Sequence, residues 1–572
     1  MPFAPLLWVL MPHTDCRRSG RGAASLLGAA LASVALLLTP GSASAQSVVA
    51  GRPVSTVSVT TNEVAAIPKS FLGFSMNVEE MEGFTNLPAF DSILNNLLNT
   101  DAVGNGPFVL RLGGTYVDSS YWENDESQVL PIYQANPAFT VTLNQAWMNS
   151  LASTVQQTGS KVILNVNAVA HDPNMAADEI ADAEQTLPKG SLLAVAIGNE
   201  PDDYNNPIIP VARSQSWARS LTPANYASLF ANYARTLRAR FPGITLAGPE
   251  ATGASTDWTS ELLQRDAGLV GLATSHVYPL NACAVPGQEA YPTIAKYLQN
   301  WLYQSATQGL SNLLTLAQRL HISYRLTELG SGTCGGVSGV NNTFATSLWV
   351  INQLFSFVSA GLDGVNVHLR ADTPNTAIMQ STSSASGLEP EPLLYGLAAF
   401  VDALEPNDVL TQASGQIQPN VSVWPVYGSD GWHVALVNYT SSPQLVELSL
   451  PATGTMTVTP LTAPTPWSTD PTFGGQTITD TGTWSGPLSA TDSLPTGGVY
   501  KVVLAPTSAA IADVQAAPGT TITALKKSSA KRTTKKKPAR KKTARKKTAK
   551  KPARAKSRKS GQRRRAAAPR RR

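Results

Sequence analysis

Cysteine, histidine and charged residues are all scarce in this sequence of 572 residues. It contains three cysteines and six histidines, and only 14% of its residues are charged. The cysteines and histidines lack the close spacing of a metal-ligand cluster, which argues against a structural metal site. A Gly-rich dinucleotide fingerprint after the first predicted strand is missing as well, which argues against a nucleotide-binding open sheet. We therefore expect a soluble globular protein that uses no cofactor and no metal.

Long apolar runs are also rare, and the one near the N-terminus predicts export. Three arginines between residues 17 and 21 precede an apolar run at 23–38, and Ala43-Ser44-Ala45 matches a signal-peptidase site. We expect residues 1–45 to be a signal peptide, so that the chain is secreted to an extracellular or periplasmic location. A short membrane anchor is the alternative, although the run is somewhat short for a bilayer. Met11 is an alternative start to Met1.

Acidic residues are absent between residues 526 and 572. This stretch holds 25 lysines and arginines, which leaves 19 basic against 38 acidic residues in the rest of the chain. We expect residues 506–572 to form a disordered tail, because its composition offers little apolar surface to bury. The charge density favours binding to acidic polysaccharide, an anionic envelope surface or extracellular DNA. A solvated arm that contacts the acidic body is the alternative.

Short apolar segments alternate with helical patterns between residues 66 and 404. The segments are rich in Val, Ile and Leu, as in parallel strands that are covered on both faces. Eight such units over roughly 300 residues match a closed (β/α)₈ TIM barrel better than an open sheet. The predicted strands are 71–77, 108–114, 161–168, 192–200, 244–250, 271–279, 322–330 and 364–369.

From residue 405 to 505 the pattern changes to short alternating runs that are separated by Gly, Pro, Asp and Ser. Such runs, for example 421–427 and 432–438, predict an antiparallel β-sandwich. The alternating segment at 53–64 has no partner in the barrel order. We therefore expect residues 46–65 to add a strand to this sandwich.

Two glutamates end predicted strands on opposite sides of the barrel mouth. Strand four runs into Asn199-Glu200-Pro201, and strand seven ends at Glu328. Active sites of such barrels lie at the carboxyl ends of the strands. Two facing carboxyl groups cleave glycosidic bonds, and a separation of roughly 5 Å gives retention of configuration. Glu250, at the end of strand five, is the rival of Glu328 for the second role.

Four segments together resemble glycoside hydrolase family 79, within the large clan of retaining (β/α)₈ glycosidases. They are Ala196-Ile-Gly-Asn-Glu-Pro-Asp202, Thr274-Ser-His-Val-Tyr-Pro279, Tyr324-Arg-Leu-Thr-Glu328 and Gly364-Val-Asn-Val-His368. The family contains β-glucuronidases and heparanase-type endoglucuronidases, and its barrel is followed by a sandwich to which the N-terminal strand contributes. The resemblance covers about residues 54–505. It implies a glycoside, polysaccharide or oligosaccharide substrate that contains a uronate.

The resemblance also implies roles for individual residues. Glu200 would be the acid/base and Glu328 the nucleophile. Asn199 would hold the sugar 2-hydroxyl, and Tyr278 would donate a hydrogen bond to Glu328. Further substrate-binding side chains are expected at Arg111, His276, His368, Asn77 and Arg370.

The loop after the predicted nucleophile departs from the pattern expected for glucuronidases. Residues 329–336 contain no aromatic side chain that would bind a uronate carboxylate. Arg370 could bind it in fork geometry, or it could pair with Asp372. A β-glucuronidase is therefore the first expectation, and a glycosidase for a neutral sugar is the alternative. A non-catalytic carbohydrate- or envelope-binding protein and a nucleic-acid-binding protein are further alternatives.

Two cysteines remain after removal of a signal that would contain Cys16. Cys283 follows predicted strand six and Cys334 follows strand seven, and neighbouring strands bring their loops together. In an oxidising compartment two such cysteines favour a disulfide. We expect it at the rim of the active site.

Overall fold

The structure is a computed structural model that describes residues 53–98, 106–123, 138–206, 217–253, 255–405 and 407–524. The predicted signal peptide at 1–45 and the basic stretch from 526 onward lie outside the described residues. Within the described ranges, no helix combines the length and the apolar character that crossing a membrane requires.

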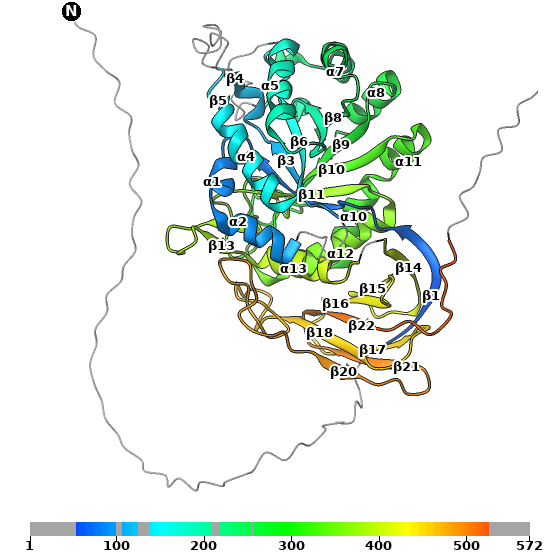
Figure 1. The fold of residues 1–572 in the computed structure, drawn as a ribbon. Coiled ribbons are helices and arrows are strands. Elements are labelled where there is room, and N and C mark those ends of the chain that lie inside the picture. Colours follow the sequence, from blue (N-terminus) through cyan, green and yellow to red (C-terminus); the bar gives the residue numbers. More distant parts are fainter. Residues whose placement is uncertain are drawn as a thin grey trace, which may run out of the picture. The chain divides into compact units, whose positions relative to one another are not determined.

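Eight parallel strands close into a barrel, which confirms the predicted fold (Figure 1). Seven of the predicted segments contain their strand in full, and the fifth, 244–250, overlaps a strand at Leu246–Thr252. Their order around the barrel is β2, β3, β6, β7, β8, β9, β10 and β11. The bounds are β2 (Leu72–Asn77), β3 (Val109–Gly113), β6 (Lys161–Val166), β7 (Leu192–Ile197), β8 (Leu246–Thr252), β9 (Leu272–Val277), β10 (Ser323–Leu329) and β11 (Gly364–Leu369).

The side chains inside the barrel form layers of different character. One layer consists of small and branched apolar residues that form a core cluster of their own, namely Val109, Ile163, Ala194, Ala196, Ala247 and Leu272. Nearer the carboxyl ends of the strands, the buried residues are polar, among them Ser75, Arg111 and Asn165. The apolar layer closes the barrel floor, and the polar layer above it is the place for chemistry.

Helices cover the outside of the barrel. The N-cap side chain, on the residue just before the helix, explains where several of them begin. Asn144, Asp172 and Thr222 each accept a backbone N–H at a helix start, which satisfies donors that the helix leaves open. The helices are α1 (Met81–Thr85), α2 (Pro88–Ile93), α4 (Gln145–Thr158), α5 (Pro173–Thr186), α7 (Pro223–Arg240), α8 (Thr256–Asp266), α9 (Ile294–Tyr297), α10 (Asn300–Gly309), α11 (Ser311–Leu320), α12 (Phe344–Ala360) and α13 (Pro392–Asp402).

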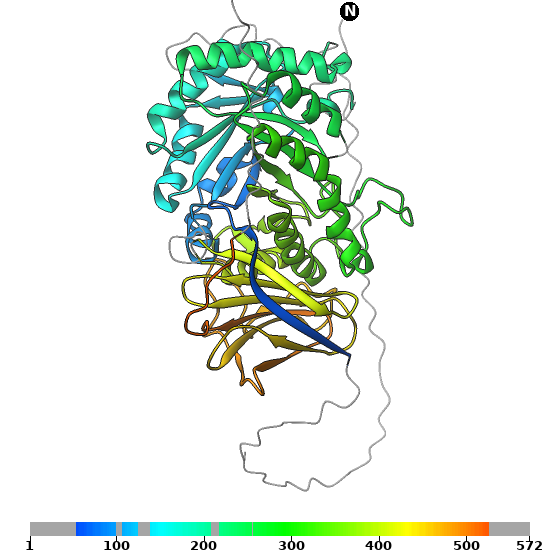
Figure 2. The same cartoon turned by 90° about the vertical axis from the view of Figure 1, so that its right-hand side faces the viewer.

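The strands that follow the barrel form a mostly antiparallel sheet to which the N-terminal strand belongs. β1 (Val54–Ala66) pairs antiparallel with β14 and parallel with β17, and Figure 2 shows it in blue beside strands from the far end of the chain. The sheet order is β19-β18-β22-β16-β15-β14-β1-β17-β21, with β20 paired to β18. The bounds are β14 (Val409–Gln416), β15 (Val421–Tyr427), β16 (Trp432–Asn438), β17 (Gln444–Ser449), β18 (Met456–Thr462), β19 (Thr472–Phe473), β20 (Thr491–Ser493), β21 (Val499–Leu504) and β22 (Ser508–Val514).

Both ends of this sheet contribute to one apolar core. Met456 of β18, near one end of the strand order, belongs to the same buried cluster as Val446 of β17 and Tyr500 of β21 at the other end. The sheet is therefore folded over on itself as a sandwich. Trp424 of β15 donates to the side chain of Asn352 in α12, at 2.7 Å. This bond ties the sandwich to a helix of the barrel.

The predicted end of the sandwich at residue 505 is wrong. β22 pairs with both β16 and β18, and Thr523 forms a bridge with Asn62. Residues 506–524 are therefore part of the sheet domain and not of a disordered tail. The alanines of β22 resemble a linker in composition, but their small side chains are buried between two neighbouring strands.

Two short strand pairs lie in the loops that follow barrel strands. β4 (Ser120–Glu123) pairs with β5 (Val141–Asn144), and β12 (Ile378–Gln380) forms a hairpin with β13 (Leu388–Pro390).

Candidate active site

Arg111 is the centre of a buried hydrogen-bond network inside the barrel. Its side chain is fully buried in β3, and a guanidinium has five N–H donors. All five are used: Nε donates to Asn165 (3.1 Å), Nη1 to Ser75 (3.0 Å) and Glu328 (2.6 Å), and Nη2 to Asn199 (2.7 Å) and Glu250 (2.5 Å). Arg111 thus lines the pocket floor, where it holds the side chains that surround the pocket.

Glu200 and Glu328 face each other above this floor. Glu200 follows β7, and Glu328 lies in β10. One carboxylate oxygen of each residue lies within 4.8 Å of the other, which is close to the separation of about 5–5.5 Å in retaining glycosidases. The backbone N–H of Glu200 donates to the carbonyl of Glu250 at 3.0 Å. That bond fixes a residue whose φ of 46° lies in the left-handed region.

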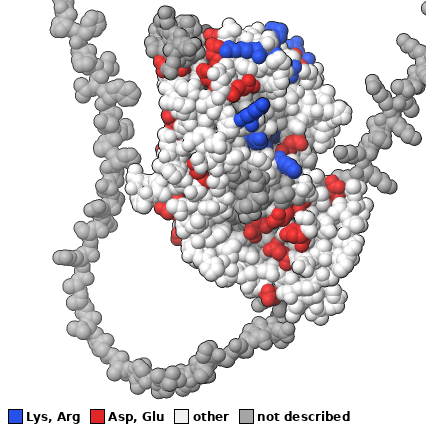
Figure 3. All heavy atoms as spheres, in the orientation of Figure 1, with Lys and Arg blue, Asp and Glu red and all other residues white. Residues whose placement is uncertain are grey.

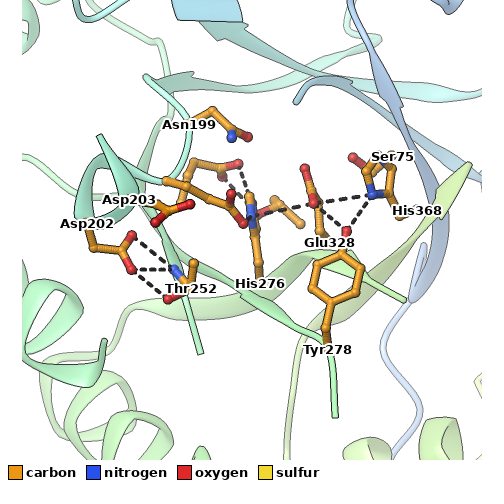
Figure 4. A network of polar contacts seen from close by, with 12 residues as sticks. Ser75, Asn199, Asp202, Asp203, Thr252, His276, Tyr278, Glu328 and His368 are labelled. Atoms are coloured by element: carbon orange, nitrogen blue, oxygen red, sulfur yellow. Dashed lines mark hydrogen bonds and ion pairs between the residues drawn. The ribbon is translucent and has the colours of Figure 1, made fainter. Parts of the chain in front are cut away.

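The environment keeps Glu328 ionised. Burial alone would raise its pKa, but the charges of His276 and Arg111 and a hydrogen bond from Tyr278 hold the pKa well below its usual range. The Tyr278 hydroxyl donates to Glu328 Oε2 at 2.6 Å, as the sequence predicts. Figure 4 shows Tyr278 and His368 next to Glu328. Glu328 is therefore a carboxylate that can act as a nucleophile.

The pKa of Glu200 is shifted in the opposite direction. Burial raises its pKa, the nearby charge of Glu328 raises it further, and the contact with His276 opposes both without cancelling them. Two carboxyl groups of one pocket therefore differ in protonation state. Such a difference is what assigns an acid and a nucleophile in a glycosidase.

His276 lies between the carboxyl groups as a cation. Its Nδ1 is 2.8 Å from Glu200 Oε1, and its Nε2 is 3.2 Å from Glu250 Oε2. Burial lowers its pKa, but the charges of Glu328, Glu200 and Glu250 outweigh burial and raise the pKa to about 10. Glu200, His276 and Glu328 are grouped closely enough to hold a metal ion. A protonated imidazole has no free lone pair for a metal, so this arrangement suits acid–base chemistry better.

Glu250, the rival of Glu328, has a different environment. Its Oε2 accepts from Arg111, from Asn165 (3.1 Å) and from His276, and its Oε1 accepts from Thr327 (2.9 Å). The side chain is fully buried, whereas that of Glu328 is 5% exposed. The charge of Arg111 outweighs burial and lowers the pKa of Glu250 to about 2. Glu250 is thus a counter-ion below the pocket, out of reach of a substrate.

Asn199, His368 and Asn77 form the remaining wall. Asn199 Oδ1 accepts from Arg111, which fixes the amide so that its Nδ2 is the group left for a substrate hydroxyl. His368 Nδ1 contacts the Tyr278 hydroxyl, and its Nε2 is 3.2 Å from Asn77 Oδ1. Burial lowers the pKa of His368 to about 4, so this histidine is neutral.

Arg370 does not pair with Asp372. Its Nε donates to both carboxylate oxygens of Glu80, at 3.0 and 3.1 Å, and its Nη2 lies 2.8 Å from Oε1. The fork geometry that was expected for a substrate carboxylate is therefore used for a carboxylate of the protein.

Asp118 is a site residue that the sequence analysis missed. It is buried after β3, where Oδ2 accepts from the Asn199 backbone N–H (2.8 Å) and the Tyr204 hydroxyl (2.5 Å), and Oδ1 accepts from the Ala168 N–H (2.8 Å). It therefore shapes the loop that presents Asn199 and Glu200. Ser75, Asn165 and Thr327 were missed as well, although a polar residue inside an apolar strand was a signal that could have found them.

The predicted disulfide is present in the structure. Cys283 and Cys334 are bonded, and beside them Asn281 and Thr333 form a backbone bridge between the loops that follow β9 and β10. Asn281 Oδ1 also accepts from the Thr333 hydroxyl at 2.8 Å. The loops next to Tyr278 and Glu328 are thus joined at the rim.

Comparison with known proteins gives a likeness in structure alone. No protein-family model matches the chain, and no curated protein sequence matches it. A 4-O-α-L-rhamnosyl-β-D-glucuronidase from Fusarium oxysporum has a TM-score of 0.65 at 18% identity, over 80% of this chain and 99% of that one. The fold is that of the (β/α)₈ glycosidases.

Two family 51 α-L-arabinofuranosidases share this fold. The protein from Bifidobacterium longum has a TM-score of 0.56 at 12% identity, over 80% of this chain and 98% of its own. The protein from Thermotoga petrophila has a TM-score of 0.56 at 14% identity, over 80% of this chain and 99% of its own. The narrower resemblance to family 79 stays a prediction.

Proposed function

We propose that the protein is a retaining glycoside hydrolase that acts outside the cell or in the periplasm. The observation that supports this most directly is the pair Glu200 and Glu328, which lies within 4.8 Å and whose pKa values are shifted in opposite directions. A non-catalytic binding protein has no need for this difference between the two groups.

The reaction is a double displacement. Glu328 attacks the anomeric carbon while Glu200 gives its proton to the glycosidic oxygen, so that the aglycone leaves as an alcohol and a glycosyl ester forms. Glu200, now a carboxylate, then takes a proton from water, and the water oxygen displaces Glu328 from the anomeric carbon. Asn199 Nδ2 holds the sugar 2-hydroxyl, and Tyr278 orients the nucleophile.

For the substrate we propose a β-glucuronide first. The family resemblance and the likeness to the Fusarium oxysporum glucuronidase support this choice. A neutral sugar is the second candidate, because the guanidinium groups of Arg111 and Arg370 are both engaged by protein carboxylates. Either substrate fits the same mechanism.

The test is hydrolysis of a panel of 4-nitrophenyl β-glycosides that includes the glucuronide. We expect wild-type turnover of at least one member, and a loss of more than about 1,000-fold in the Glu328→Ala variant. Azide should restore turnover of this variant, with a glycosyl azide of inverted configuration, because the small anion fits the space of the carboxylate. Wild-type turnover without such a loss would overturn the assignment of Glu328. Inactivity on the panel and on polysaccharides would overturn the proposed function.

A further inference from the structure

A cavity of about 840 Å³ lies against the β12–β13 hairpin. Its volume is in the range of about 300–1,000 Å³ that small-molecule sites have. Its polar lining includes Glu80, Asp372, Gln380, Ser381, Ser384 and Ser386.

The cavity adjoins the Glu328 side of the pocket. Glu80 follows Asn77 closely in sequence, and Asp372 follows His368. Since Asn77 and His368 are in contact at the ends of β2 and β11, the two segments leave the pocket together. Around the barrel, β11 and β2 lie opposite β7 and β8, and Glu200 follows β7. The cavity is therefore on the side remote from the acid.

This position decides which part of a substrate could reach the cavity. Glu200 protonates the oxygen that leaves, so the aglycone departs on the Glu200 side. The part of the sugar chain that stays attached to the reacting sugar, toward the non-reducing end, extends the other way. The cavity lies where the next sugar unit on that side would be.

The lining groups have the chemistry of a sugar site. The Gln380 amide offers donors and an acceptor for sugar hydroxyls, and the Asp372 carboxylate offers acceptors. Ser384 and Ser386 donate their O–H groups to Asp480, so their oxygens add only acceptor capacity. The side chains of Asp372 and Gln380 make no hydrogen bond with another residue among those that the structure describes. They are thus available to a ligand.

The hairpin that lines the cavity is held in place before any ligand binds. The Gln380 amide packs against Gly83 of α1, where an added Cβ would lie 2.2 Å from Nε2. At the hairpin tip, Ser384 Oγ donates to Asp480 Oδ2 and Ser386 Oγ to the Asp480 carbonyl, both at 2.9 Å. The sandwich domain therefore supports the hairpin, which reduces the entropy that ligand binding would cost.

The charge of the cavity argues against an anionic sugar. The carboxylates of Glu80 and Asp372 line it. Arg370, the cation that adjoins the cavity, is bound to Glu80. A second uronate would add a negative charge to this set and would be repelled.

We propose that this cavity binds a second, neutral sugar unit, linked to the non-reducing side of the sugar that Glu328 attacks. The inference rests on the proposed function and extends it to the substrate's length and charge. The protein then prefers glycosides with at least two sugar units on this side of the cleaved bond.

The test compares the best 4-nitrophenyl monosaccharide of the panel with 4-nitrophenyl disaccharides of the same inner sugar and a neutral outer glucose, galactose, xylose or rhamnose. We expect kcat/KM of wild type to be at least tenfold higher for one disaccharide. Gln380→Ala should reduce this advantage to less than threefold and leave monosaccharide turnover unchanged. Gln156→Ala, an exposed position of α4, is the matched control.

Two results would overturn the inference. One is monosaccharide turnover with no gain from any outer sugar, and the other is a gain that Gln380→Ala does not reduce. Total inactivity would overturn the proposed function instead. In that case calorimetric titration with the free disaccharides tests the cavity. We expect wild type to bind one of them and Gln380→Ala to bind it more weakly; equal binding by both proteins, or no binding by wild type, would contradict the inference.

Discussion

At Glu200 and Glu328, neighbouring side chains convert two chemically identical groups into an acid and a base. The proton of Glu200 must be present for the first step, so kcat/KM should fall as the pH rises through its raised pKa. At low pH, kcat/KM should fall where Glu328, with its depressed pKa, becomes protonated.

The Glu200→Gln variant tests this assignment. We expect the alkaline limb to disappear and kcat/KM for a phenyl glycoside to fall by about 10²–10⁴-fold. The loss should be smaller for a 4-nitrophenyl glycoside, whose leaving group needs less protonation. The measurement is a pH profile of both substrates with both proteins, and an unchanged alkaline limb in the variant would assign that limb to another group.

Glu250 should matter more for stability than for the chemical step. A Glu250→Gln substitution removes the buried counter-ion that Arg111 and His276 share, which costs about 3–5 kcal/mol of unfolding free energy. Glu261→Gln is the control, because Glu261 is paired with Arg265 on the surface and such pairs contribute less than about 1 kcal/mol. Urea unfolding measures both, and equal losses would contradict the buried role.

At the scale of elements, His433 ties β16 to β22. Its Nδ1 lies 2.7 Å from Asp513 and its Nε2 lies 3.1 Å from Asp430, and the carboxyl groups of Asp402, Glu405 and Asp408 are nearby. Burial lowers the pKa of His433, but Asp513 and Asp430 outweigh it and raise the pKa to about 9.

This shift makes the stability of the sandwich depend on pH. Because the folded state binds the proton more tightly, the stabilisation is complete below the unfolded pKa of about 6.5 and is lost as the pH rises through about 9. His433→Gln should therefore lower the urea midpoint at pH 6 and have a smaller effect at pH 10. An effect of equal size at both values would show that the proton is not involved.

The elements differ in how well the sequence predicts them. The eight barrel strands are predictable because each has a local apolar pattern, and β1 because its alternation fits no barrel position. β22 is not predictable from its own sequence, because its alanines are buried only by strands that lie elsewhere in the chain. The same holds at the site: Glu200 and Glu328 end strands in recognisable motifs, whereas Asp118 is important only through its contacts with Asn199 and Tyr204.

At the scale of the whole molecule, charge is segregated along the chain. Figure 3 shows Asp and Glu side chains gathered on one face over the sandwich, and the stretch from 526 to 572 contains 25 basic residues. We propose that this stretch binds anionic polymers. The salt dependence of such binding is steep, because each neutralised charge releases a counter-ion.

A chain that ends at residue 525 tests this proposal. We expect the full chain to bind dextran sulfate at 50 mM salt and to lose about 10³-fold or more of its affinity by 200 mM. The shortened chain should not bind, and its turnover of 4-nitrophenyl glycosides should be unchanged, because it keeps the described sheet up to the bridge of Thr523 with Asn62. Equal binding by both chains would place the binding surface on the folded body.

The pairing of β1 has a consequence for biosynthesis. Thr56 pairs with Gln416 and Glu447, so the first strand to emerge during translation finds its partners only after the whole barrel sequence has been made. Until then it is an unprotected edge that can pair with other nascent chains. The interval between synthesis of β1 and synthesis of β17 is therefore the period in which this protein is most exposed to misassembly.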